Sequence, residues 1–468
     1  MSDDKNKKME SSNTEVSPKT DEEPGRFTAP LICLPDEVES FSRRELLRTG
    51  VSLTAFTSIT SLLGMPKAAR GAVNFPPKRK LIWINMSGGW DILEAVDPKT
   101  ASTSGIDMVY NYDDASTLAG GDGTKIGRWF SNVAAMGTDV LAVRGIAMGT
   151  TSHEAGSIYM DTSILSNTGR VNAASIPSIV ASESEAVVPI IQLSGGSEPR
   201  TDRGLLNPVS AVRASNLDLY RSMYPTDAAQ ITRRIEMLDY LKASVTKHEG
   251  IVGVNDRLTN LATAEQKIRV QFEGNVGLKL ALSAADKEDF SAANTSGRGD
   301  GTSDAFALAT KLVINDVVTC VNLGVGGFDT HANQTMRMQP IVEKTDRLLK
   351  VMVDKLRASG KLDTTLIVLY SDFGRTPKVN GSNGRDHWPV GGALMIGGGI
   401  AGGRAVGGTD DMLRALSINQ TTGAFDTAGI QLSPAHLAGS ILALTLGSSY
   451  LTYRPYMTEL ALLTKLKG

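Results

Sequence analysis

Acidic and histidine side chains recur in this sequence directly after short apolar runs and glycine turns. In Asp329-Thr-His331 the two side chains are two positions apart, so in an extended segment both point to one side and can reach a single metal ion. A carboxylate with an imidazole suits zinc, manganese or iron. His387, in the motif GRDHW, can complete the shell of that ion. An isolated Asp-x-His is more often turn chemistry, and a loop histidine often bonds a backbone carbonyl, so the metal prediction requires these groups to meet.

Two further carboxylates follow apolar runs, Asp91 in GGWD and Asp372 in SDFG. Two carboxylates held close together need a cation to remain ionised. The pair therefore predicts a second metal ion. The alternative for each is an Asx-turn at the end of a strand.

Hydroxyl groups gather in the turn GTTSHEAG, where Thr151 and Ser152 are candidate nucleophiles. A hydroxyl is a poor nucleophile at its free pKa, and a bound metal ion activates it. Ser152 is also placed to cap a helix with Glu154 in its first turn, and both roles can coexist. Arg375 and Arg385 are candidates to bind non-bridging phosphoryl or sulfuryl oxygens, with solvated loop charges as the alternative.

Strand-like apolar runs alternate with helical segments along residues 72–468, which predicts a single α/β domain. Such alternation favours a mainly parallel central sheet with helices on both faces. In such sheets ligands bind beyond the carboxyl ends of the strands. Four polar clusters fall there: Asp91, Thr151 with Ser152, Asp329 with His331, and Asp372. We therefore expect the clusters to meet at one sheet edge. Residues 216–285 read as mostly helical and could form a cap over the site.

Composition argues against a polyelectrolyte partner. The 468-residue chain has a formal net charge of -2, so nucleic acid is not an expected ligand. With 41% hydrophobic residues it can bury a substantial core.

The N-terminal region has the order of parts of an exported protein. Residues 1–40 are polar and charge-mixed, which predicts a disordered leader. Residues 41–71 place Arg43 and Arg44 before a mildly apolar run and small residues, the pattern of a twin-arginine export signal. The apolar run, residues 49–64, has 16 residues, short of the ~20 that span a bilayer, so no stable transmembrane span is expected. These features predict a partner in the twin-arginine machinery and a periplasmic or secreted location, with cleavage of the signal left open.

The motifs LIWINMSGGWD, SHEAG, GGFDTHANQ, SDFGRTPKVNGSNGRDHW and LSPAHLAGSILALTLG together resemble a bacterial family of exported proteins of unknown function within the alkaline phosphatase and sulfatase superfamily. The resemblance implies an alkaline-phosphatase-like fold and two metal ions beside a Ser, Thr or formylglycine nucleophile. Carried over by position, Asp329, His331 and His387 resemble the ligands of one metal, and Asp91 and Asp372 those of the other.

The same resemblance likens Ser152 or Thr151 to the nucleophile, and no cysteine stands there to form formylglycine. Two departures concern the metals. Well-studied members separate the Asp and His by three residues where this chain has one, and Phe373 stands where a histidine often follows the second-site Asp.

These observations predict an exported hydrolase that acts on a small-molecule or polymer-linked phosphate or sulfate ester and uses one or two divalent ions, zinc or manganese. The alternative is a non-catalytic envelope protein that keeps the fold for binding or assembly. A third possibility is hydrolysis by metal-activated water without a covalent intermediate.

Overall fold

The computed structural model describes residues 79–99, 114–166, 171, 173–184, 186, 188–200, 209, 211–213, 224, 226–246, 269, 271–294, 301–420 and 422–453. The predicted leader and export signal lie outside these residues. Within them, no helix has both the length and the apolar character needed to cross a membrane.

An eight-stranded sheet forms the centre, in the order β12-β4-β11-β8-β1-β7-β5-β6. Only β11 is antiparallel to its neighbours, and every other adjacent pair is parallel. The predicted α/β class with a mainly parallel sheet is confirmed. The strands are β1 (Lys80–Ser87), β4 (Val140–Ala147), β5 (Val188–Gln192), β6 (Ala211–Arg213), β7 (Val318–Gly326), β8 (Thr365–Tyr370), β11 (Val390–Gly397) and β12 (Arg404–Gly407).

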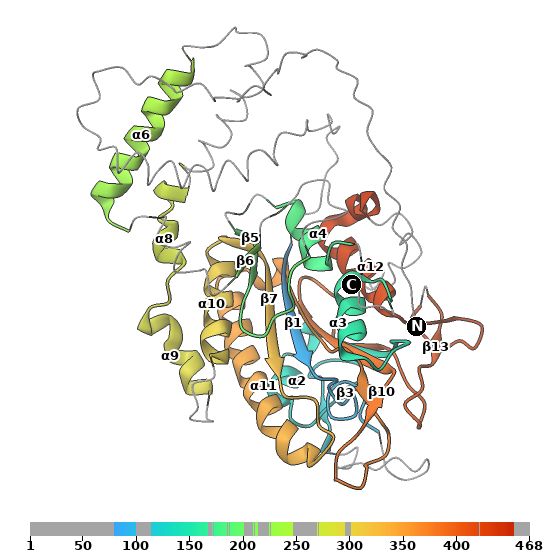
Figure 1. Ribbon diagram of the computed structural model, residues 1–468. Coiled ribbons are helices and arrows are strands. Elements are labelled where there is room, and N and C mark those ends of the chain that lie inside the picture. The colour runs from blue at the N-terminus through green and yellow to red at the C-terminus, as the bar shows by residue number, and fades with distance from the viewer. Residues whose placement is uncertain are drawn as a thin grey trace, which may run out of the picture. The chain divides into compact units, whose positions relative to one another are not determined.

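The central strands are buried on both sides because helices cover both faces (Figure 1). Alternate residues of β1 show this: Ile82 and Ile84 belong to one core cluster, and Leu81 and Trp83 to the other. The first cluster includes residues of α2 (Ser131–Ala135), α9 (Ala284–Ala293), α10 (Thr302–Ile314) and α11 (Gln334–Ala358). The second includes residues of α3 (His153–Thr162), α4 (Ile176–Ser182) and α12 (Pro434–Leu446).

The region predicted to be a helical insertion contains α6 (Ala228–Thr246) and α8 (Val276–Lys279). Five buried side chains of this region join the core cluster of the α10 and α11 face: Tyr224, Leu238, Phe272, Val276 and Leu280. Much of residues 216–285 lies outside the described residues, so the cap over the site stays a prediction.

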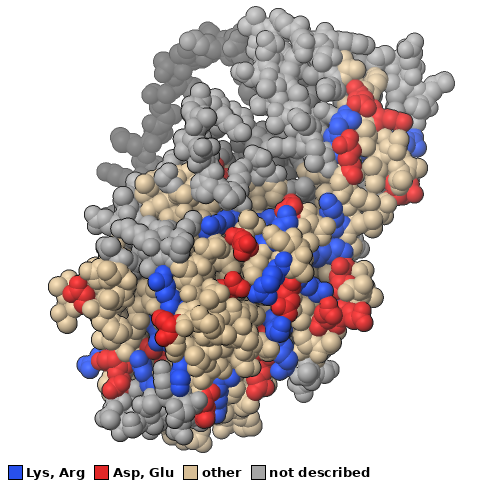
Figure 2. All heavy atoms as spheres, turned by 180° about the vertical axis from the view of Figure 1, so that it is seen from behind, with Lys and Arg blue, Asp and Glu red and all other residues tan. Residues whose placement is uncertain are grey.

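Short elements complete the chain and carry surface loops. They are β2 (Ser116–Thr117), β3 (Lys125–Ile126), β9 (Gly374–Arg375), β10 (His387–Trp388), β13 (Ser417–Ile418), β14 (Ile430–Gln431) and the 3-10 turns η2 (Gly137–Asp139), η4 (Leu362–Thr364) and η5 (Gly447–Thr452). On the face shown in Figure 2, the described basic and acidic side chains are interspersed.

Candidate metal centre

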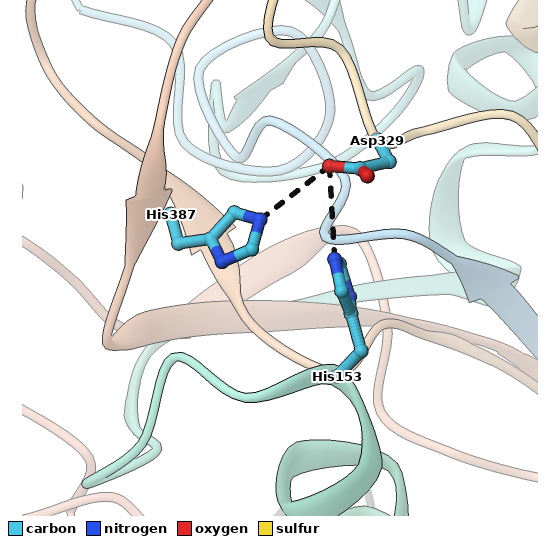
Figure 3. Close-up of side chains that lie close together, drawn as sticks. All are labelled: His153, Asp329 and His387. Carbon is cyan, nitrogen blue, oxygen red and sulfur yellow. Dashed lines mark hydrogen bonds and ion pairs between the residues drawn. The ribbon is translucent and has the colours of Figure 1, made fainter.

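Three histidines and one carboxylate meet at the edge where the parallel strands end. Asp329 lies just after β7, His153 is the first residue of α3, and His387 is the first residue of β10. Figure 3 shows both rings turned toward the Asp329 carboxylate. The Nε2 atoms of His153, His331 and His387 lie 3.6, 3.1 and 3.4 Å from Asp329 Oδ1.

These four side chains do not contribute equally. One ligand atom from each of His153, Asp329 and His387 lies within 4.8 Å of the others, the spacing of a shared metal ion. His331 stands beside this group, with its Nε2 3.0 Å from that of His387. The structure therefore brings together Asp329, His331 and His387 as the sequence analysis expected, and it adds His153.

An oxygen acceptor holds Nδ1 of each of the three rings. His331 Nδ1 lies 2.8 Å from Asp386 Oδ1, and His387 Nδ1 lies 2.9 Å from the carbonyl oxygen of Thr151. His153 Nδ1 is hydrogen-bonded to Asp372 Oδ2. Because such acceptors require a proton on Nδ1, each neutral ring keeps its lone pair on Nε2.

The lone pairs of three Nε2 atoms and a carboxylate oxygen thus face one another, which is repulsive without a cation between them. His153 Nε2 is inaccessible to solvent and has no hydrogen-bond partner. Histidines whose Nδ1–H bonds an oxygen while Nε2 faces inward are typical of metal ligands. The donor set therefore fits a divalent ion.

Electrostatics favour a cation here as well. Burial opposes ionisation of Asp329, but the hydrogen bond and the charge of Arg375 outweigh it and lower the pKa of Asp329 to about 2. The hydrogen bond to Asp372 raises the pKa of His153 against the effect of burial, because a carboxylate stabilises positive charge on the ring. The Asp329 side chain is 53% exposed, so the centre is open to solvent.

The Ser-Gly-Gly turn after β1 shapes the floor of this centre. The backbone amides of Gly88 and Gly89 donate to Asp372 Oδ1 at 3.3 and 2.5 Å. Both glycines have positive φ, 112° and 73°. A Cβ at Gly88 would lie 2.5 Å from the Asp329 nitrogen, and one at Gly89 would lie 2.6 Å from the Phe373 ring. Only glycine permits this approach of β1 to the two acidic loops.

Asp91 does not join the metal centre. Its side chain is buried, with Oδ2 3.0 Å from Nε of Arg385 and 2.5 Å from Nε2 of Gln334. Its Oδ1 accepts from the backbone amide of Leu93 at 2.9 Å. Burial raises the pKa of Asp91, and the nearby Arg385 opposes that rise. Asp91 thus pairs with Arg385 and Gln334, whereas Asp372 contacts His153, so the two carboxylates predicted to share one ion have different partners.

Both arginines of the candidate oxygen-binding pair are buried, contrary to the alternative that they are solvated loop charges. Arg385 Nη1 donates to the carbonyls of Thr376 and Pro377 at 2.8 and 2.5 Å. All three guanidinium nitrogens of Arg375 also contact groups of the protein, as detailed below. These internal contacts are a different use of the guanidinium groups from the substrate binding that the sequence suggested.

The turn that carries Thr151 and Ser152 contacts the metal centre through its backbone. The Ser152 side chain is exposed and its Oγ accepts from the Ala155 amide at 3.5 Å, so Ser152 is the N-cap of α3, with Glu154 in the first turn. Thr151 supplies the carbonyl that binds His387. The capping alternative is therefore observed, and it leaves the Ser152 hydroxyl in contact with solvent.

Two residues of the centre received no role from the sequence. His153 follows Ser152 directly and is one of only five histidines in the chain, so its place in a strand-end cluster was an available signal. Asp386 precedes His387 and contacts His331, 55 positions away. A contact of this range leaves no periodic pattern in a single sequence.

Fold and site together define an α/β protein with a candidate metal centre at the carboxyl edge of a mainly parallel sheet. The chain belongs to the family described as "Protein of unknown function (DUF1501)", whose model matches residues 78–423. No curated protein matches the chain.

Solved structures of a sulfatase, a lipoteichoic acid synthase and an alkaline phosphatase show a distant likeness. The PsFucS1 sulfatase from Pseudoalteromonas sp. has 11% identity and a TM-score of 0.33, covering 89% of this chain and 76% of that one. The lipoteichoic acid synthase LtaP from Listeria monocytogenes has 9% identity and a TM-score of 0.32, covering 84% and 78%. A mutant TAB5 alkaline phosphatase with bound Mg has 13% identity and a TM-score of 0.30, covering 69% and 93%.

Proposed function

We propose that this protein is a metal-dependent hydrolase of phosphate or sulfate esters. The observation that carries the proposal is the convergence of three imidazole Nε2 atoms on Asp329 Oδ1, each ring being fixed through Nδ1 by an oxygen acceptor. Three imidazole nitrogens and a carboxylate oxygen aimed at one point form the mixed donor set of a divalent-ion site, although Arg375 Nη2 also donates to Asp329 Oδ1 at 2.7 Å.

His153, Asp329 and His387 would hold the ion, with His331 beside them. Their mixed nitrogen and oxygen donors suit zinc or manganese. When bound, a divalent ion supplies Lewis acidity, neutralising charge on an anionic ester and on an attacking oxygen. Because Asp329 and His331 are about half exposed, the centre can admit an ester carried on a small molecule or on a polymer.

Ser152 is the proposed nucleophile. It lies between His153, a candidate ligand, and Thr151, whose carbonyl orients His387. Its Oγ would form a bond to phosphorus or sulfur while the ester oxygen leaves as an alcohol, taking up a proton. Water then cleaves the seryl ester, restoring the hydroxyl and releasing phosphate or sulfate.

The position of this hydroxyl also favours an anionic substrate. It caps the N-terminus of the ten-residue helix α3, where the positive end of the helix dipole and free amide groups attract negative charge. Helix capping and nucleophilic attack use the same Oγ, so the two roles have to be separated by experiment.

The test compares two serine caps. Wild-type protein should contain bound transition metal and hydrolyse aryl phosphates or aryl sulfates. Ser152→Ala should lose hydrolysis and keep the metal. Ser283→Ala is the matched control, because Ser283 is an exposed N-cap of α9 that accepts from the Asp286 amide at 3.2 Å. Each substitution should cost ~1 kcal/mol of stability, but only the first should affect turnover.

The possible results separate the rivals. If the purified protein contains no metal and stays inactive after addition of zinc or manganese, the hydrolase proposal is refuted. Unchanged hydrolysis in Ser152→Ala assigns the attack to water, and a cellular phenotype lost with Asp329→Ala but kept with Ser152→Ala indicates a metal-containing binding or assembly protein.

We also propose export by the twin-arginine route, on the basis of Arg43 and Arg44. The double variant Arg43→Lys/Arg44→Lys should remain in the cytoplasm, whereas Arg48→Lys in the same segment should still be exported. Cell fractionation distinguishes the outcomes, and equal export of all three proteins would refute the proposal.

A further inference from the structure

The second ion implied by the superfamily resemblance does not fit the residues present. Its candidate ligands are Asp91 and Asp372, and protein groups already satisfy both. Asp372 Oδ1 accepts from Gly88, Gly89 and the Ser371 hydroxyl, the last at 2.8 Å, while Oδ2 binds His153. Asp91 is committed to Arg385, Gln334 and Leu93.

The side chain that follows Asp372 offers no ligand either. Phe373 is fully buried and packs against both ligand rings, with its ring centroid 4.7 Å from that of His153 and 4.5 Å from that of His387. It supports the two imidazoles but donates no electron pair to a metal.

A buried guanidinium lies instead between the turn after β1 and the metal centre. Arg375 is 0% exposed, and its Nη2 donates to Asp329 Oδ1 at 2.7 Å. The same nitrogen donates to the Gly88 carbonyl, and Nε donates to the Gly89 carbonyl at 2.8 Å. Nη1 donates to the Arg385 carbonyl at 3.0 Å and lies 3.5 Å from His331 Nε2.

We infer that the centre binds one metal ion, and that the Arg375 guanidinium takes the place of the second. The inference rests on the proposed metal site and refines its composition. An arginine side chain stays charged under all ordinary conditions, so it supplies a fixed positive charge beside Asp329. Unlike an ion, it cannot dissociate, and the β9–β10 pairing that sets Arg375 opposite His387 anchors it.

The formal charges around the centre support a composition of one metal ion and the Arg375 guanidinium. Asp329, Asp372 and Asp386 surround the centre with three negative charges, and Arg375 with one divalent ion provides three positive charges. A second divalent ion would leave the centre two charges in excess and would have to approach the buried guanidinium. The arrangement is neutral with one ion.

The experiment counts ions on the intact protein. Wild-type protein is dialysed against Zn²⁺ and, separately, Mn²⁺, and bound metal is measured by elemental analysis, with Mn²⁺ magnetic resonance as a second readout. We expect one equivalent and a spectrum without coupling between ions. Two equivalents or a coupled spectrum would overturn the inference and leave the hydrolase proposal standing. Absence of binding would refute the metal site itself, and this inference with it.

The variant Phe373→His tests which of two features prevents binding of a second ion: the Arg375 guanidinium, or the absence of a histidine at position 373. If the guanidinium excludes the second ion, this variant still binds one equivalent even though it restores the missing histidine. A second equivalent in Phe373→His would show that the lost histidine, and not Arg375, limits the count. His436→Gln is the control, since glutamine preserves the capping box at the start of α12 and His436 lies outside the centre.

Discussion

Two acidic side chains at the ends of adjacent strands differ in burial and in the groups that surround them. Asp91 follows β1 and Asp329 follows β7, which pairs with β1 in parallel. Both are preceded by glycine turns. Yet the Asp91 side chain is 0% exposed and paired with Arg385, whereas the Asp329 side chain is 53% exposed and faces three histidines.

The difference lies in the partners, not in the acids. Around Asp91 the side chains of Arg385 and Gln334 and the amide of Leu93 supply donors, so the protein itself satisfies the carboxylate. Around Asp329 three Nε2 lone pairs accompany a single guanidinium, so the donors are too few. A strand-end carboxylate is structural in the first surroundings and a candidate ligand in the second.

Removal of Arg385 should have the largest effect and tests whether Asp91 is purely structural. Arg385→Met leaves the Asp91 carboxylate buried without its charge partner, and we expect a loss of ~3–5 kcal/mol in the free energy of unfolding, measured by urea denaturation of metal-free protein. Metal stoichiometry of the folded fraction should not change. The double variant Asp91→Asn/Arg385→Met should recover most of the stability. Loss of metal binding in folded Arg385→Met would place Asp91 and Arg385 in the metal centre after all.

Removing the exposed acid should have the reverse effect. Asp329→Asn keeps the shape of the side chain but deletes the anionic ligand, so metal affinity should fall by more than the ~10- to 100-fold that outer contacts contribute. Stability should change little in comparison with Arg385→Met. Competition with a chelator measures the affinity, and His436→Gln provides the unchanged reference. Wild-type affinity in Asp329→Asn would exclude Asp329 as a ligand.

The sheet and its binding edge were predictable from local pattern. In each cluster an acid or hydroxyl follows an apolar run within a few residues, with a glycine close by. Such a local pattern is visible in the sequence without knowledge of the tertiary structure. Asp329 and His331 point to one region because they are two residues apart after a strand.

The side chains that pair with these strand-end carboxylates were not predictable in the same way. Arg385 and Asp91 are almost three hundred positions apart, and a charged loop residue gives no sign in the sequence that it will be buried. Arg375 and Arg385 read equally well as surface charges, yet both fill the interior. Burial of such groups depends on which carbonyls and carboxylates the folded chain brings to them.

A smaller effect is expected from the acceptor behind His331. Asp386 lies 2.8 Å from His331 Nδ1 and fixes which ring nitrogen faces the centre. Because His331 stands beside the three proposed ligands, Asp386→Asn should weaken metal binding by only ~10-fold, the lower end of what outer contacts contribute, without loss of stoichiometry at saturating metal. Asp410→Asn serves as control, since Asp410 accepts from backbone amides in a turn outside the centre. Equal affinities of the two variants would remove Asp386 from the support of the centre.

A test by pH dependence concerns Glu94, which lies beside the buried Asp91. Neither of its carboxyl oxygens has a hydrogen-bond partner, and burial followed by the charge of Asp91 raises its pKa to about 9, from 4.5. The folded chain therefore keeps a proton that the unfolded chain loses, so this contribution to stability is full below pH 4.5 and declines as pH rises toward 9. The slope cannot exceed ~1.4 kcal/mol per pH unit for one proton.

Glu94→Gln should flatten this decline, because an amide of the same shape does not titrate. Urea denaturation of metal-free protein at several pH values between 5 and 8 measures the slope. Glu154→Gln, an exposed change at the start of α3, should leave the slope as in the wild type. If Glu94→Gln and wild type decline in parallel, Glu94 is ionised in the fold, and the charges of Arg128 and Arg385 outweigh its burial and the charge of Asp91.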